Sequence, residues 1–121
     1  MKDILLVGLG GFIGSALRYG VALGATRLFD PRFYIGTMAV NLIGSLLIGI
    51  LFGLFAKQQN QFSLLLITGF CGGFTTFSTF SLDGMKLLRQ NMYLDFLAYA
   101  SISMLGGLLL CFIGYYLFNK G

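Results

Sequence analysis

The sequence predicts an all-α integral membrane protein with four transmembrane helices. Hydrophobic residues make up 57% of the 121 residues and charged residues only 10%, which is too little charge to cover a soluble surface. Apolar runs recur along the chain, each close to the ~20 residues that a helix needs to cross the hydrocarbon core. The linkers between the runs are short, so residues 1–121 form a single four-helix transmembrane domain.

The first helix is expected at residues 4–26 and the second at residues 33–56. Lys2 followed by an apolar run is also typical of a signal peptide, but the full-length runs that come later favour a retained helix. Arg18 interrupts the first run. Its cost in the membrane is reduced if the side chain snorkels to a lipid phosphate or faces a water-filled vestibule, where it would concentrate anions. Both interpretations of Arg18 remain open at this point.

Polar residues follow one face of the second helix. Thr37, Asn41 and Ser45 are spaced four residues apart, and Tyr99 and Ser103 repeat this spacing in the fourth helix. A polar group at membrane depth needs a partner or a function. These groups are neutral donors, which suit a small anion better than a cation. The alternative is that the stripes only join helices through hydrogen bonds.

The third helix is expected at residues 62–88 and the fourth at residues 93–119. Gly72-Gly73 predicts a break near the middle of the third helix. Freed carbonyls at such a break can hold a bare cation. Nearby hydroxyls can cap the restarted helix; they belong to Thr75, Thr76, Ser78 and Thr79. Phe77 and Phe80 share a helix face, and their ring edges, which are positive, can either meet an anion or pack against neighbours.

The charges do not favour one orientation in the membrane. With both termini on one side, that side carries Lys2, Lys57 and Lys120, and the other carries Arg27, Arg32, Lys86 and Arg89. This near balance gives the positive-inside rule little to act on. We therefore expect insertion in both orientations and pairing with an inverted copy. Close packing of helices, within the chain or between copies, is offered by three GxxxG pairs: Gly10 and Gly14, Gly20 and Gly24, Gly49 and Gly53.

Three motifs resemble those of the Fluc (CrcB) fluoride channels, and together they span essentially the whole chain. "GFCGGFTTFSTFS", at 69–81, resembles the family's third-helix signature and is the most specific of the three. "GGFIGSALRY", at 10–19, resembles the glycine-arginine motif of the first helix. "GTMAVNLIG", at 36–44, resembles the GTxxVNxxG motif of the second. Tyr99 and Ser103 match the fourth helix.

The resemblance implies a fluoride-selective channel that exports fluoride passively from the cytoplasm, across the inner membrane of a bacterial cell. It implies a dual-topology homodimer with two antiparallel pores. It also implies a structural Na+ at the dimer centre, held by the main-chain carbonyls of Gly72 and Thr75. The expected partners are a second copy of the chain, fluoride and the lipid bilayer, with no nucleic acid.

The resemblance also implies roles for side chains along the pore. Phe77 and Phe80 would turn their ring edges toward fluoride, Asn41 would donate to it, and Arg18 would lie near the vestibule. The expected polar pathway is completed by Thr37, Thr76, Ser78, Ser81, Tyr99 and Ser103. Asp83 stands where the family usually has glutamate, one methylene longer, so no role that demands tight geometry is assigned to it. Gly107 falls where some members have a serine.

Two other functions compete with this interpretation. A small multidrug resistance type exporter, which couples proton entry to cation exit, is also a four-helix dual-topology dimer. It needs an acidic residue in the middle of a span, whereas the acids here lie near span ends: Asp3, Asp30, Asp83 and Asp95. A membrane scaffold without transport is the second competitor. We expect no enzyme, because the chain has no histidine and "VGLGG" has Ile13 where a dinucleotide motif needs its third glycine.

Overall fold

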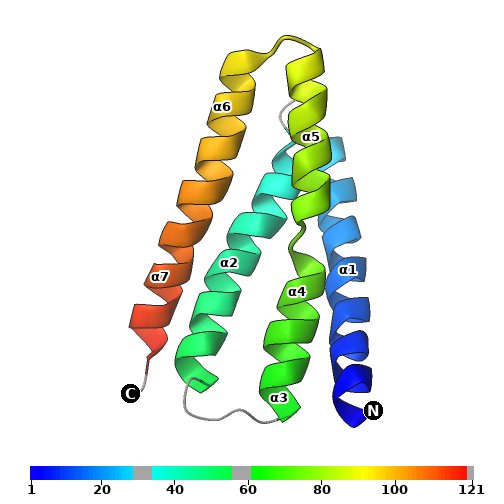
Figure 1. The fold of residues 1–121 in the computed structure, drawn as a ribbon, viewed down its shortest axis with the longest axis vertical. Helices are drawn as coiled ribbons and strands as arrows, with labels where there is room; N and C mark the ends of the chain where they lie inside the picture. Colours follow the sequence, from blue (N-terminus) through cyan, green and yellow to red (C-terminus); the bar gives the residue numbers. More distant parts are fainter. Residues whose placement is uncertain (29–33, 56–60, 120–121) are drawn as a thin grey trace.

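The computed structural model describes residues 1–28, 34–55 and 61–119, and all regular elements in these ranges are helical (Figure 1). The first span is α1 (Lys2–Leu28) and the second is α2 (Ile35–Phe55). The third span consists of α3 (Gln61–Ser63), η2 (Leu64–Cys71), α4 (Gly72–Phe74) and α5 (Phe77–Arg89). The fourth consists of α6 (Tyr93–Ser101), η3 (Ile102–Gly106) and α7 (Gly107–Phe118). The segments η2 and η3 are π-helical.

All four spans are long and apolar enough to cross a membrane, which confirms the predicted all-helical membrane protein. α1 begins and α7 ends at the same end of the bundle (Figure 1). Two predicted helix ends, Phe33 and Ala56, lie outside the described residues. So do several of the charges counted above: Asp30, Arg32, Lys57 and Lys120.

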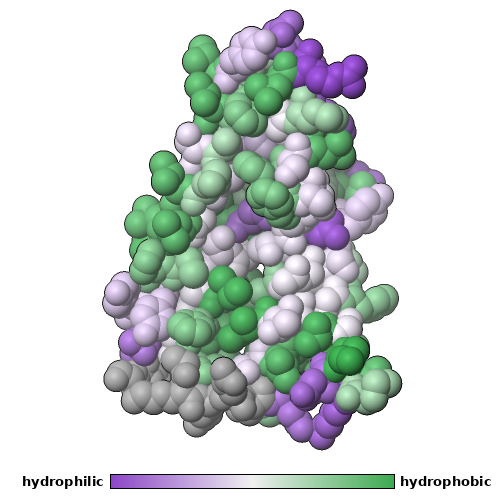
Figure 2. Space-filling model, in the orientation of Figure 1, coloured by the Kyte–Doolittle hydropathy of each residue, from purple (hydrophilic) through white to green (hydrophobic). Residues whose placement is uncertain are grey.

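Apolar side chains face outward over most of the bundle. Phe12 is 72% exposed and Leu94 is 81% exposed, whereas Val40, Cys71 and Leu87 are almost completely buried. Figure 2 shows hydrophobic side chains over much of this face, with hydrophilic ones gathered where α5 meets α6 and near the start of α1. An outward apolar band between polar ends is what the hydrocarbon core of a bilayer requires.

Glycines set the distance between α1 and the first half of the third span. A Cβ on Gly10 or Gly14 would collide with the backbone of residues 65–74. From the other side, a Cβ on Gly69 would lie 2.8 Å from the Val7 carbonyl oxygen, and one on Gly73 2.6 Å from that of Gly11. The two backbones are therefore in direct contact, as small residues allow in a membrane.

The second and fourth spans also pack closely at glycines. A Cβ on Gly49 would collide with the Cys111 backbone, and one on Gly53 would lie 2.8 Å from the Tyr115 carbonyl oxygen. Gly20 and Gly24 differ, because an added Cβ would meet no atom of the described residues within 4 Å. Two of the three predicted GxxxG pairs thus pack within the chain, and the third lies open.

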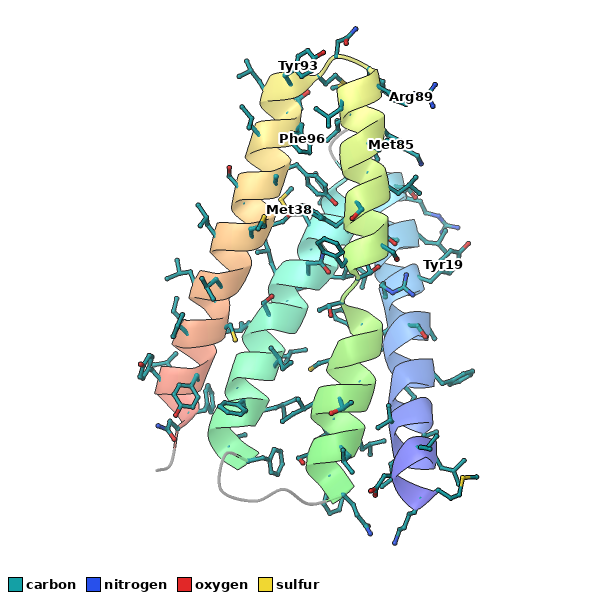
Figure 3. The ribbon with its side chains drawn as sticks, viewed as in Figure 1. Tyr19, Met38, Met85, Arg89, Tyr93 and Phe96 are labelled. Atoms are coloured by element: carbon teal, nitrogen blue, oxygen red, sulfur yellow. The ribbon has the colours of Figure 1, made fainter. Side chains whose placement is uncertain are left out.

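A short turn joins α5 to α6 at the far end of the bundle. Asn91 has φ 59°, a left-handed conformation that asparagine tolerates better than most residues, and its side-chain oxygen accepts a hydrogen bond from the Tyr93 hydroxyl at 3.0 Å. Below the turn, Gly84 of α5 makes room for the Phe96 ring, which lies between the two helices (Figure 3). The turn and this contact hold α5 against α6.

Candidate functional site

The site is built around two extended residues in the third span. α4 ends at Phe74 and α5 begins at Phe77, and between them Thr75 (φ −87°, ψ 159°) and Thr76 (φ −151°, ψ 126°) are not helical. The Thr75 amide and hydroxyl both donate to the Cys71 carbonyl, at 3.1 and 2.9 Å. Thr75 therefore closes the first helical half through its amide and hydroxyl, while its own backbone and that of Thr76 are extended.

Thr76 starts the second half as its N-cap. Its hydroxyl oxygen accepts a hydrogen bond from the Thr79 amide at 3.2 Å and also contacts the Thr79 hydroxyl at 3.2 Å. The Ser78 hydroxyl lies 3.4 Å from the same oxygen. A threonine cap of this kind satisfies a helix-terminal N–H that has no acceptor within the helix.

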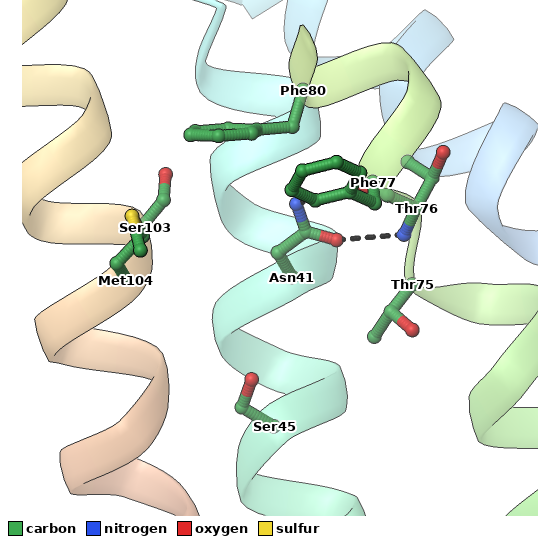
Figure 4. Close-up of a pocket in the computed structure, with 8 residues that line it drawn as sticks. All are labelled: Asn41, Ser45, Thr75, Thr76, Phe77, Phe80, Ser103 and Met104. Carbon is green, nitrogen blue, oxygen red and sulfur yellow. Dashed lines mark hydrogen bonds between the residues drawn. The ribbon is translucent and has the colours of Figure 1, made fainter.

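Asn41 of α2 binds both backbone groups of Thr76. Its side-chain oxygen accepts from the Thr76 amide at 2.9 Å (Figure 4). Its Nδ2 donates to the Thr76 carbonyl at 3.1 Å. The sequence indicated a functional amide here but not this bidentate contact. An amide nitrogen carries two N–H groups, and within the part of the chain that the structure describes only one of those on Nδ2 has an acceptor, so the second remains as a donor.

Arg18 of α1 contacts the break from the other side. Its Nε donates to the Gly73 carbonyl at 3.1 Å, across 55 positions of sequence. The side chain is half-buried. Neither of the two earlier interpretations of Arg18 included this contact with the third span.

A pocket of about 230 Å³ opens beside the break, and three spans contribute to it (Figure 4). Its lining combines hydroxyls, one amide and aromatic rings, from Asn41, Ser45, Thr75, Thr76, Phe77, Phe80, Ser103 and Met104. The Ser103 oxygen is buried and has no hydrogen-bond partner among the described residues. A buried hydroxyl without a partner is costly unless something else binds it.

Seven of the nine expected pathway residues fall into two groups, and the other two lie apart on α5. Five of them line this pocket: Asn41, Thr76, Phe77, Phe80 and Ser103. Thr37 and Tyr99 lie at a separate place near Asp83: Thr37 lines a hollow together with Asp83, and the Tyr99 hydroxyl donates to the Asp83 carboxylate. Ser78 and Ser81 are exposed on α5, and Ser81 lines a second hollow that shares Phe80 with the first pocket.

A row of aromatic rings joins the two groups. The ring centroids of Phe77 and Phe80 are 5.9 Å apart, those of Phe80 and Tyr99 5.1 Å, and those of Tyr99 and Tyr34 6.0 Å. All three pairs are tilted, with interplanar angles between 38° and 42°. Tilted rings present positive edges as well as faces to their surroundings. The row runs from the break to the buried acid.

Asp83, to which no role that demands tight geometry was assigned from the sequence, is buried and makes a defined hydrogen bond. It is 5% exposed, and its Oδ2 accepts a hydrogen bond at 3.1 Å from the hydroxyl of Tyr99, which is 3% exposed. The signal for this was present in the sequence, because Asp83 shares a helix face with Phe80, Gly84 and Leu87. Burial, and then the nearby Asp83 carboxylate, raise the pKa of Tyr34, which precedes α2.

Comparison with known proteins gives a consistent result. The family model described as "CrcB-like protein, Camphor Resistance (CrcB)" matches residues 5–115. A protein from Gloeothece citriformis named "Fluoride-specific ion channel FluC" is 45% identical over the full length of both chains. Proteins of the same name from Cereibacter sphaeroides and Rhizobium etli are 43% and 52% identical; the alignments cover 85% and 74% of this chain, and 83% and 74% of theirs.

Proposed function

Because this chain belongs to the CrcB family, we propose that it is a fluoride-selective ion channel. The relatives' names describe channels, so the prediction that the chain is not an enzyme is confirmed. The observation that carries the proposal is the lining of the pocket beside the break. Hydroxyls, an amide and two phenylalanine rings meet there, and no charged side chain is among its described lining residues.

The chemistry of this lining suits a small, strongly hydrated anion. Such an ion enters only if the path replaces its water, and it leaves only if no single contact holds it too tightly. The Ser103 hydroxyl has no protein partner among the described residues, and Asn41 keeps a second N–H, so both have donors to offer. The edges of Phe77 and Phe80 add weaker positive contacts. A narrow bore with these walls excludes larger halides by size.

The pathway continues from the pocket toward Asp83. The Phe77–Phe80–Tyr99 row provides ring edges and then a phenol, and Thr37 adds a hydroxyl at its far end. Ser78 and Ser81 stand beside this row on α5, and Thr76 stands at its start. Arg18 supplies the cation near the entrance. Transport is passive: fluoride that enters the cell as HF ionises in the more alkaline cytoplasm and leaves through the channel.

We further propose that two inverted copies form the channel, with one pore on each side of the dimer. The pocket is open to the outside of the single chain, and the Phe77 ring beside it is 78% exposed. A second copy would cover this ring and close the pocket into a pore. The near balance of cations between the two ends allows both orientations of insertion, in the inner membrane of a bacterial cell.

A sodium ion at the centre of the dimer fits the donors at the break. Carbonyl oxygens are ligands that hard cations accept, and the extended Thr75–Thr76 segment frees several of them from helical bonding. Among the side-chain and cap hydrogen bonds of the described residues, none ends on the carbonyl of Gly72 or Thr75. We propose these two carbonyls, from both copies, as the ligands. The ion would hold the two breaks together.

Fluoride efflux from vesicles tests the channel proposal. Purified full-length chain in liposomes loaded with potassium fluoride should release fluoride when potassium can follow through an ionophore, without any proton gradient. Vesicles loaded with potassium chloride should retain their chloride under the same conditions. Exchange of a cationic drug for protons would instead identify a multidrug-type exporter. Absence of both activities in a folded preparation would leave the scaffold interpretation and overturn the proposal.

A further inference from the structure

The break leaves particular backbone groups without their helical partners. In an uninterrupted α-helix each carbonyl accepts from the N–H four residues further on. The Gly72 carbonyl would bind the Thr76 amide, and the Gly73 carbonyl would bind the Phe77 amide. The extended conformation at Thr75 and Thr76 breaks both pairs. At membrane depth each freed group must find another partner.

Two side chains from other helices form hydrogen bonds with backbone groups at the break. Arg18 donates through Nε to the Gly73 carbonyl at 3.1 Å. Asn41 accepts from the Thr76 amide at 2.9 Å and donates to the Thr76 carbonyl at 3.1 Å. By holding the Thr76 amide, Asn41 removes the donor that would otherwise close on the Gly72 carbonyl. The contacts therefore fall on Gly73 and Thr76 and leave the carbonyls of Gly72 and Thr75 uncontacted by these two side chains.

The Arg18 contact is fixed by the packing of the backbones. Gly11, Gly14 and Arg18 lie on one face of α1, because they are three and then four residues apart. Gly14 packs against the backbone of Phe70 and Phe74, and a Cβ on Gly73 would lie 2.6 Å from the Gly11 carbonyl oxygen. The Arg18 side chain thus starts from a helix already in contact with the break, so its reach to Gly73 is short.

We propose that Arg18 and Asn41 are positioning residues for the cation site at the break. They bind the backbone of Gly73 and Thr76, and thereby keep the carbonyls of Gly72 and Thr75 free for the ion. This inference rests on the proposed sodium site, and it gives Arg18 a role beyond that of a charge near the entrance. The essential feature of Arg18 is the N–H donor on its Nε, since its positive charge works against a nearby cation.

Substitutions at Arg18 separate the donor from the charge. In glutamine the amide nitrogen is bonded to Cδ, as Nε is in arginine, so Arg18→Gln keeps a donor at the same reach and loses the charge. Arg18→Met has similar bulk and loses both. Arg27→Met is the matched control, because Arg27 is an exposed cation at the end of the same helix.

The measurement is the thermal unfolding midpoint of the purified full-length chain, titrated with NaCl against N-methyl-D-glucamine chloride at constant ionic strength. Wild type and Arg27→Met should show the same sodium-specific rise in unfolding temperature. We call the sodium concentration that gives half of this rise the sodium midpoint. Arg18→Gln should keep its sodium midpoint within about threefold of wild type. Arg18→Met should raise it by about tenfold, which corresponds to about 1.4 kcal/mol.

Each alternative result has a distinct meaning. Equal sodium midpoints in Arg18→Met and wild type, or equal weakening in Arg18→Met and Arg18→Gln, would overturn the positioning role. If Arg18→Met does not fold, Asn41→Leu replaces it: it leaves α1 intact, and an unchanged sodium midpoint there would also overturn the inference. A wild type without sodium response that still releases fluoride would reject the cation site but leave the channel. A wild type that binds sodium without releasing fluoride would reject the channel alone.

Discussion

The two halves of the third span are built differently, although they follow one another directly in the sequence. The first half, Gln61–Phe74, touches α1 backbone to backbone through Gly69 and Gly73. The second half, Phe77–Arg89, begins after Thr76, whose backbone is bound by Asn41 of α2, and it ends in the turn into α6. Backbone-to-backbone packing fixes the first half, whereas side-chain contacts, both polar and aromatic, fix the second.

This difference explains where the candidate site lies. Close backbone packing against α1 leaves no room for an ion beside Gly69 and Gly73, so the first half is an anchor whose freed carbonyls lie at its end, next to the break. The side-chain contacts of the second half leave space between the spans, and Phe77, Phe80 and Thr76 line the pocket in that space. The break therefore lies where the closely packed first half of the third span ends and the polar lining of the pocket begins.

The largest effect should come from disturbing the anchor. Gly14→Val would push Cβ and two further carbons into the Phe70 and Phe74 backbone, which cannot move aside as a flexible side chain would. Overpacking of this kind costs about 1–3 kcal/mol in a tolerant core, and we expect the upper end or more here. The thermal unfolding midpoint and the monodisperse yield in detergent measure it. Gly20→Val is the control, and an equal loss there would contradict the contrast.

The next effect should come from the buried pair in the second half. Tyr99→Phe removes the hydroxyl that donates to Asp83, and the carboxylate is left buried without that bond. Losing one partner of a buried hydrogen bond costs about 1–3 kcal/mol. The free energy of unfolding should fall accordingly, while Tyr116→Phe, at a residue that is 69% exposed, should change it little. If Tyr99→Phe is as stable as Tyr116→Phe, the pair does not hold this half.

A third change separates function from stability. Phe80→Ile keeps an apolar side chain but removes the ring that joins Phe77 to Tyr99. We expect fluoride efflux to fall by about tenfold, equivalent to about 1.4 kcal/mol in the barrier, with little change in unfolding. Phe77→Ile should act in the same direction. Unchanged efflux in both variants would reject the role of the ring edges.

The sequence predicts the spans well, because hydrophobicity and length decide what crosses a membrane. It predicts packing less completely: the Gly10 and Gly49 pairs were recognisable, but the backbone that each one meets depends on the fold. The π-helical segments Leu64–Cys71 and Ile102–Gly106 were not predicted, since a small change in helical period leaves an apolar run looking the same.

The site was predicted by residue type rather than by contact. Asn41 was expected to bind an anion, and the structure shows its amide on the Thr76 backbone, a contact that no spacing rule between distant helices supplies. Asp83 was not expected to fill a role that demands tight geometry, because its shortened side chain was judged alone, without the Tyr99 hydroxyl that reaches it. In both cases the missing information was the partner on another span.

The smallest effect should come from the cap at the start of the second half. Thr76→Ala removes the oxygen that accepts from the Thr79 amide, and loss of an N-cap typically costs about 1 kcal/mol. The cost should stay near this value because Asn41 still holds the Thr76 backbone, which does not depend on the side chain. Thr76→Ser, which keeps the oxygen, should match wild type in thermal unfolding. A loss in Thr76→Ala as large as that in Gly14→Val would mean that the cap anchors this half as firmly as close packing anchors the other, and the contrast between them would disappear.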